Sequence, residues 1–164
     1  MKKQLNFKEA ELQKSEEIIL NPEIDLKLRK TELCKISGKE TLVLAEIFYE
    51  LQKQKDYALL IDIVEKIQSE KFAYQIACDR DNDFVIRETA IRRIRTQRWL
   101  FALAFRNDAW EIRKMAISRM NNIMMLKALT KTARNYFIAE MAKRRIDEVK
   151  NRDAWLKSNP EDSL

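Results

Sequence analysis

The chain has 164 residues, 46% of them hydrophobic and 35% charged, with a net charge of +6, a balance that excludes a disordered chain and suits a soluble helical protein. One glycine and two prolines almost exclude hairpins, glycine-rich phosphate loops and most sheet folds. The lack of histidine removes the commonest general base and the commonest zinc ligand.

Targeting signals are not evident in the sequence. No apolar run approaches the roughly 20 residues that a membrane helix needs. The first residues, MKKQLNFKEAELQKSEE, open with two lysines but carry no apolar stretch behind them, unlike a signal peptide. Cys34 and Cys78 have no CxxC spacing, and a reducing compartment would keep them as small buried hydrophobes rather than as a disulfide. We therefore expect a cytoplasmic protein that does not contact a membrane.

Capping residues predict the first helices. Asn6 with Glu9 predicts a capping box before a helix of about residues 7 to 20. Asn21, with Pro22 at the first helical position, is expected to open the second helix.

Ser37 and Gly38 predict the end of that second helix. A third helix is expected to run to about Gln54, and Asp56 can cap a fourth. The fourth carries apolar residues at helical spacing, namely Leu59, Leu60, Ile63, Val64 and Ile67.

From residue 85 the chain repeats one helix pattern with a period of 26 residues: VIRETAIRRI at 85–94, EIRKMAISRM at 111–120 and FIAEMAKRRI at 137–146. Each copy carries an i, i+4, i+8 apolar stripe, which predicts one buried helix face. The stripes are Ile86, Ala90 and Ile94, then Ile112, Ala116 and Met120, then Ile138, Ala142 and Ile146.

A second, shorter helix is predicted after each of the first two copies, with Thr96 and Asn122 as N-caps. Trp99, Leu100 and Leu103 in one match Met125, Leu126 and Leu129 in the other. With a one-residue insertion, the same columns accept Ile63, Ile67, Phe72 and Ile76. DLKLRKT at 25–31 also parallels DFVIRET at 83–89, so the array of helix pairs extends upstream.

A helix pair of this size cannot bury its apolar face alone, so successive pairs are expected to stack into a single-domain, all-α solenoid. The predicted units span about 20–56, 57–83, 84–108, 109–135 and 136–156, and a polar tail follows at 157–164.

These units resemble HEAT-like repeats, in which an Asp stands shortly before an apolar-Arg pair at the start of a helix. The resemblance covers about residues 20–150 and is carried by Asp83 before Ile86-Arg87 and by Asp108 before Ile112-Arg113. The third copy departs from it, with Ile138-Ala139 in place of the apolar-Arg pair. The resemblance implies a right-handed α-α superhelix and a binding surface rather than an enzyme.

Charge is distributed unevenly along the chain. Residues 1–84 hold 14 Lys+Arg and 17 Asp+Glu, a net of −3, whereas residues 85–164 hold 18 and 9, a net of +9. This asymmetry predicts a positive field over the C-terminal half, able to steer an acidic protein or a polyanion.

The arginines fall into classes by their helical angle. Arg92 and Arg95 point away from the core stripe into solvent and, with Arg98, are candidates for partner binding. Arg87 and Arg113 follow the capping aspartates and are expected to be structural. A third class occupies one column of the repeat beside the core: Arg93, Arg119 and Arg145.

Stacking would bring this third class into a row of like charges. Either an anionic partner offsets the row, or each guanidinium bonds the last carbonyls of its helix or an Asp in a neighbouring loop. Both alternatives are open, so the candidate partner-binding residues are Arg92, Arg93, Arg95, Arg98, Arg119 and Arg145.

Aromatic and methionine side chains are assigned mainly to the core. The helical spacing of Trp99, Phe105 and Trp110 favours core packing over stacking platforms for exposed bases. Met124 and Met125 are interpreted as core filler.

The sequence therefore predicts a non-enzymatic binding protein, with no metal, cofactor or small-molecule substrate, whose basic C-terminal half contacts an acidic protein. An inhibitor or immunity protein of a toxin, or an adaptor, is a small helical binder of this kind. The alternative is a nucleic-acid-binding repeat protein that contacts phosphates through the same arginines.

Overall fold

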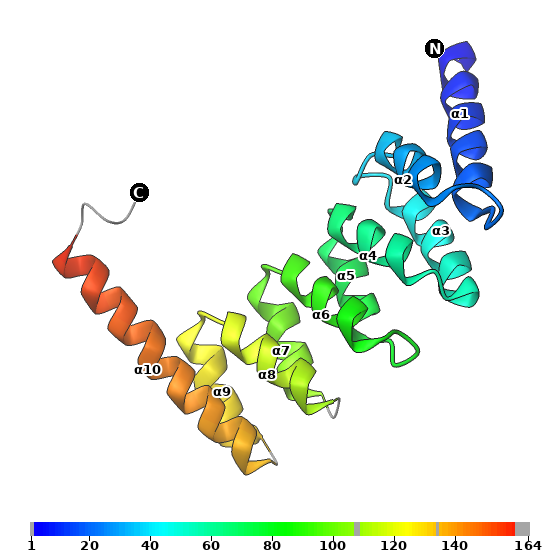
Figure 1. The fold of residues 1–164 in the computed structure, drawn as a ribbon. Coiled ribbons are helices and arrows are strands. Elements are labelled where there is room, and N and C mark those ends of the chain that lie inside the picture. Colours follow the sequence, from blue (N-terminus) through cyan, green and yellow to red (C-terminus); the bar gives the residue numbers. More distant parts are fainter. Residues whose placement is uncertain (1, 107–108, 134, 160–164) are drawn as a thin grey trace. The chain divides into compact units, whose positions relative to one another are not determined.

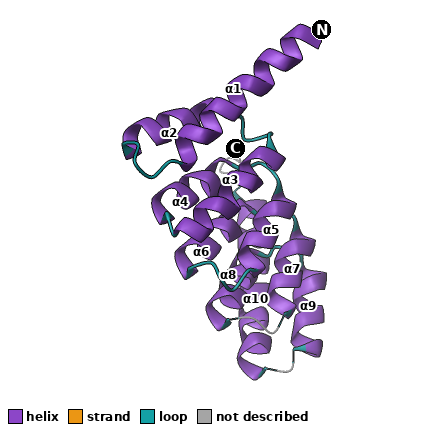
Figure 2. Cartoon of the chain, turned by 90° about the vertical axis from the view of Figure 1, so that its right-hand side faces the viewer, coloured by secondary structure: helices purple, strands orange, loops and turns teal. Residues whose placement is uncertain are grey.

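The computed structural model describes residues 2–106, 109–133 and 135–159, and every regular element in these ranges is an α-helix (Figures 1 and 2). The predicted all-α class is confirmed. In chain order the helices are α1 (Lys2–Leu20), α2 (Leu26–Lys35), α3 (Thr41–Gln54), α4 (Tyr57–Lys66), α5 (Glu70–Cys78), α6 (Phe84–Arg93), α7 (Gln97–Phe105), α8 (Trp110–Arg119), α9 (Ile123–Thr132) and α10 (Tyr136–Ser158).

Short polar side chains begin several helices. The Asp56 carboxylate accepts a hydrogen bond from the Leu59 backbone N–H at 3.4 Å, and the Asn122 side chain accepts one from Met125 at 3.1 Å. Both predicted N-caps are confirmed. Thr96 occupies the N-cap position of α7, but its side chain makes no capping hydrogen bond.

The predicted start of the first helix is wrong. α1 already begins at Lys2, so Asn6 lies inside the helix and is not its N-cap. The segment KKQL before Asn6 contains good helix formers and no breaker, which lets the helix continue toward the N-terminus past the expected box.

The predicted start of the second helix is also wrong, because Asn21 forms a local turn. Its side chain accepts a hydrogen bond from the Glu23 N–H at 3.0 Å, which competes with helix formation. α2 begins only at Leu26, and Asp25 caps it by accepting from the Lys27 N–H at 2.9 Å.

The single glycine lies where two backbone segments meet. α2 ends at Lys35, which confirms the break predicted at Ser37 and Gly38. A Cβ on Gly38 would lie 2.2 Å from the Lys66 carbonyl oxygen, and the Gln68 N–H donates to the Gly38 carbonyl at 3.1 Å. Only a residue without a side chain permits this approach.

The helices form two compact units, residues 1–93 and 94–164, and each has two layers of alternate helices. In the first unit α2 packs on α4 and α4 on α6, while α1 packs on α3. In the second unit α7 lies beside α9 and α8 beside α10 (Figure 2). The division falls between α6 and α7, inside the predicted repeat unit 84–108. The one-domain, five-unit organisation stays a prediction.

The predicted apolar columns form much of the core of both units. All nine stripe residues between Ile86 and Ile146 are buried, and so are the upstream matches at 63, 67, 72 and 76. The middle position of each stripe is an alanine with no exposed surface, so the side chain there leaves room for a closely packed neighbour.

Replacing Ala90 with Asp should strongly destabilise the first unit, because an unpaired carboxylate would enter a fully buried position. We expect the free energy of unfolding to fall by about 3 kcal/mol or more, measured by urea denaturation with circular dichroism. Ala58→Asp is the matched control, since Ala58 is exposed in the first turn of α4, where a carboxylate is tolerated. Equal midpoints for both variants would show that the columns are wrongly assigned.

Candidate functional site

Three buried arginines join consecutive helices. The Nε atoms of Arg29, Arg87 and Arg113 donate to the carbonyls of Ile19, Ala77 and Ala104 at 2.7, 2.9 and 2.8 Å. Each acceptor is the penultimate residue of the preceding helix. Arg87 and Arg113 are therefore structural, as predicted, and Arg29 shows that the parallel between DLKLRKT and DFVIRET extends to the same contact.

The column of Arg93, Arg119 and Arg145 makes a second repeated contact. These guanidinium groups donate to the carbonyls of Ile67, Ile94 and Met120 at 3.1, 3.3 and 2.8 Å. Ile67 and Met120 are the C-cap residues of α4 and α8. The partial negative charge of helix C-termini offsets the like charges of the column. The structural alternative thus accounts for these arginines, with acceptors in the preceding repeat rather than in their own helices.

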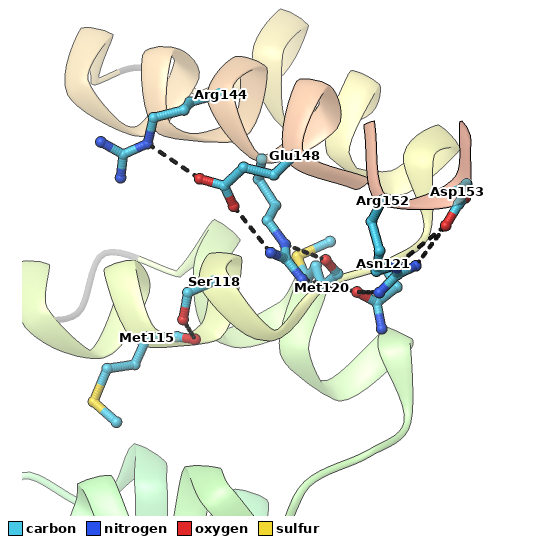
Figure 3. Close-up of polar contacts among 9 residues, drawn as sticks. Met115, Ser118, Met120, Asn121, Arg144, Glu148, Arg152 and Asp153 are labelled. Carbon is cyan, nitrogen blue, oxygen red and sulfur yellow. Dashed lines mark hydrogen bonds and ion pairs between the residues drawn. The ribbon is translucent and has the colours of Figure 1, made fainter. Parts of the chain in front are cut away.

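Arg145 has further partners in the second unit. Its Nη1 donates to Glu148 at 2.9 Å and its Nη2 to the Asn121 side chain at 2.9 Å. Figure 3 shows the neighbouring pairs, in which Arg144 faces Glu148 at 3.6 Å and Arg152 contacts Asp153 at 2.9 Å. Arg145 is consequently held by several acceptors at once, whereas Arg144 has one long contact.

The predicted outward-facing arginines differ in their surroundings. Arg92 forms an ion pair with Glu88 at 2.6 Å. The Arg95 side chain is exposed and makes no hydrogen bond or ion pair with any residue that the structure describes. The Arg98 guanidinium lies over the Trp99 ring, 4.9 Å from its centroid. Of the six candidates, Arg92 and Arg93 belong to the first unit, and the other four belong to the second.

The two units have opposite charge balances. Residues 1–93 hold 17 Lys+Arg and 18 Asp+Glu, a net of −1, whereas residues 94–164 hold 15 and 8, a net of +7. Ion pairs in the first unit include Lys8–Glu40, Arg29–Asp56, Lys30–Asp62 and Lys53–Glu50. In the second unit, exposed cations without a side-chain partner among the described residues include Arg95, Lys127, Lys131 and Lys150. The excess positive charge therefore lies on the surface of the second unit.

A recess of about 550 Å³ in the first unit lies between α1 and α2, and two of the carboxylates that line it pair with lysines. Glu32 accepts hydrogen bonds from Lys35 and from Ser15, and the bond from Lys35 is the main cause that lowers the pKa of Glu32. The contact with Lys8 likewise lowers the pKa of Glu40. Both carboxylates are thus held in ion pairs, Glu32 by Lys35 and Glu40 by Lys8.

Exposed apolar side chains begin the even-numbered helices α2, α4 and α6 of the first unit and α8 and α10 of the second, a feature that sequence reasoning missed. In the first unit Leu26, Tyr57 and Phe84 open α2, α4 and α6 and are 42, 44 and 45% exposed. In the second unit Trp110 and Tyr136 open α8 and α10 and are 46 and 71% exposed. Phe84, Trp110 and Tyr136 each stand two residues before a predicted apolar stripe, and this regular position in the sequence could have revealed them.

Three core assignments are therefore wrong. Trp110 is half exposed, Phe105 is 52% exposed and Met124 is 74% exposed. Trp110 and Phe105 lie at helix ends and Met124 lies in the first turn of α9, where fewer neighbours cover a side chain than at the middle of a helix. Trp99 and Met125 are partly buried, in better agreement with the prediction. Cys78 is likewise partly buried, but Cys34 is exposed, so its predicted burial is wrong.

The exposed Trp110 borders a second recess, of about 260 Å³, between α8 and α10. The other residues that line it are Phe137, Glu140, Met141 and Arg144. Phe137 is 67% exposed. Hydrogen bonding to Glu140 raises the pKa of Lys143, whose ammonium group pairs with that carboxylate beside the recess. The recess is thus apolar, with charged groups at its rim.

In the described part of the chain, no helix is both long and apolar enough to cross a bilayer. Nor does that part bring together three side chains of the kinds that hold a metal ion, namely histidine, cysteine, aspartate and glutamate.

Replacing Arg145 with Gln should destabilise the second unit by about 1 to 3 kcal/mol, because several charge-assisted hydrogen bonds are lost. Arg144→Gln, one position away, is the matched control and should cost less than about 0.5 kcal/mol, since that side chain is 71% exposed. Urea denaturation measures both. A loss no larger for Arg145 than for Arg144 would mean that the column does not stabilise the fold.

In comparisons with protein-family models, curated proteins and solved structures, the chain has no match. The resemblance to HEAT-like repeats consequently depends on features within this chain: the repeated apolar columns and the arginines Arg87 and Arg113. The predicted capping residue Asp108 lies outside the described residues, and Ala109 occupies the N-cap position of α8.

Proposed function

We propose that this protein works by binding rather than by catalysis, and that the basic unit 94–164 contacts an acidic surface of a protein partner. The observation that carries the proposal is the net charge of +7 on this unit, together with exposed cations that have no side-chain partner in the part of the chain that the structure describes. Self-repulsion among such cations disfavours the compact state, and an acidic partner would relieve it. An inhibitor of a toxin or an adaptor is a protein of this kind.

We also propose that the chain is a HEAT-like repeat protein whose helix pairs stack into a right-handed superhelix. Support comes from the layers of alternate helices within each unit and from the two arginine contacts that recur along the chain. Such stacked pairs present long, regular rows of side chains, which suits the recognition of another macromolecule.

Nucleic acid is the second candidate partner. Arg98 over the Trp99 ring is a pairing that can also stack on a base, and the exposed lysines of α9 could contact phosphates.

The test compares two variants with the same change in net charge. Arg95→Glu with Arg98→Glu alters the second unit, and Lys39→Glu with Lys71→Glu alters exposed positions of the first. The partner is captured from the native cells by cross-linking and purified, and association is measured with the pure proteins. We expect the arginine variant to associate at least about tenfold more slowly at low salt, and the lysine variant to behave like the parent.

A generic DNA duplex and a single strand serve as the competing ligands, titrated over a range of salt. Weak binding of both at physiological salt agrees with the protein reading. Steep salt dependence of tight nucleic-acid binding, with no protein captured, would establish the second candidate instead. Equal association rates for the two charge variants would also count against the proposed surface.

A further inference from the structure

We propose that the recess between α8 and α10 is a docking pocket for one bulky apolar side chain, presented on an acidic segment of a protein partner. This inference rests on the proposed function, which supplies the acidic partner, and adds the site at which that partner is anchored.

The recess is formed where two neighbouring helices of one layer begin. Trp110 is the first residue of α8 and Phe137 the second of α10, and α8 packs against α10. Trp110 and Phe137 are 46 and 67% exposed, and Met141 lies one turn further along α10. Two large rings and a flexible thioether thus surround a space of about 260 Å³, enough to receive a side chain but not a large ligand.

Exposed aromatic surface of this kind is unfavourable in water, and burial on a partner recovers it. Trp is among the residues that most often dominate the binding energy of protein interfaces, especially where an apolar centre is surrounded by polar groups. The pocket has that arrangement, because Glu140 and Arg144 line its edge.

The charges at the rim favour an acidic segment. The Lys114 ammonium lies over the Trp110 ring, 5.8 Å from the centroid, and the Arg144 head group is mostly exposed. Glu140 pairs with Lys143, and Glu111, next to Trp110 in the sequence, is an exposed carboxylate among the described residues. Partner carboxylates beside the anchor can therefore meet Lys114 and Arg144, in a unit whose net charge is +7.

A recess accepts a side chain, whereas insertion into a membrane needs side chains that protrude. This difference favours a protein segment over a lipid surface.

The test uses the full chain and short fluorescent peptides in which aspartates and glutamates flank a central Leu-Phe. Three further peptides carry a central Ala-Ala with acidic flanks, Leu-Phe with uncharged flanks, or Leu-Phe with lysine flanks. Anisotropy gives the dissociation constants. We expect the acidic Leu-Phe peptide to bind best, and Trp110→Ala or Phe137→Ala to weaken it at least about tenfold.

Met124→Ala is the matched control, because Met124 is 74% exposed in the same unit but lies on α9, in the other layer. It should change the affinity by less than about twofold, as expected for truncation outside the contact. Circular dichroism verifies that each variant is folded. An equal loss in Met124→Ala would overturn the assignment of the pocket.

The remaining outcomes separate this inference from the proposed function. If both acidic peptides bind equally and only the variant Arg95→Glu, Arg98→Glu weakens them, the basic surface holds and the pocket is refuted. If the uncharged or lysine-flanked Leu-Phe peptide binds as tightly as the acidic one, the acidic partner is refuted.

Self-association that Trp110→Ala abolishes, seen by sedimentation, would make the recess a contact between copies of this chain. Tight binding to phosphatidylserine vesicles that needs Trp110 would make it a membrane contact, and either result overturns the proposal.

Discussion

The fold depends on how short helices satisfy their terminal carbonyls. An α-helix leaves its last four C=O groups without partners inside the helix, and in helices of ten residues, such as α4 and α8, this is a large share of the backbone. Arginines from later helices supply the missing donors at two recurring places, the penultimate residue of the preceding helix and the end of a helix in the repeat before. Because a full positive charge meets a partial negative one, each contact fixes helix order as well as covering a polar group.

This use of arginine changes the meaning of the basic composition. Residues such as Arg113, Arg119 and Arg145 contribute to the net charge, yet their donors already point at backbone oxygens. The exposed cations that remain, including Arg95 and the lysines of α9, have no comparable internal role among the described residues. Under the proposed function, this charge excess, which folding does not use, is available for contact with another molecule.

The spacing of apolar residues predicted the helices and their buried faces, because the face of a helix that neighbouring helices cover must be apolar. The columns through Ala90, Ala116 and Ala142 are buried as expected, and the caps Asp56 and Asn122 act over three residues of sequence. The exposure of Trp110 depends instead on which neighbour reaches the end of a helix, and periodicity carries no information about that. The turn at Asn21 was missed for a related reason, because the same side chain can cap a helix or close a turn, and only the geometry of the following residues decides. The acceptor of each column arginine lies a whole repeat away, beyond the reach of helical-angle arguments.

The arginine contacts also restrict how the length of this chain can change during evolution. Arg145 and Arg119 reach acceptors 25 residues upstream, and Arg93 reaches one 26 residues upstream, where the sequence carries its one-residue insertion. An extra residue in a loop is tolerated, because the long arginine side chain can still reach its carbonyl. An insertion within a helix would rotate the residues that follow it, and so turn the arginine away from its carbonyl and the alanine out of the core. Gene variants that gain or lose one complete helix pair would keep both registers, so size variation among descendants of this sequence should occur in multiples of about 26 residues.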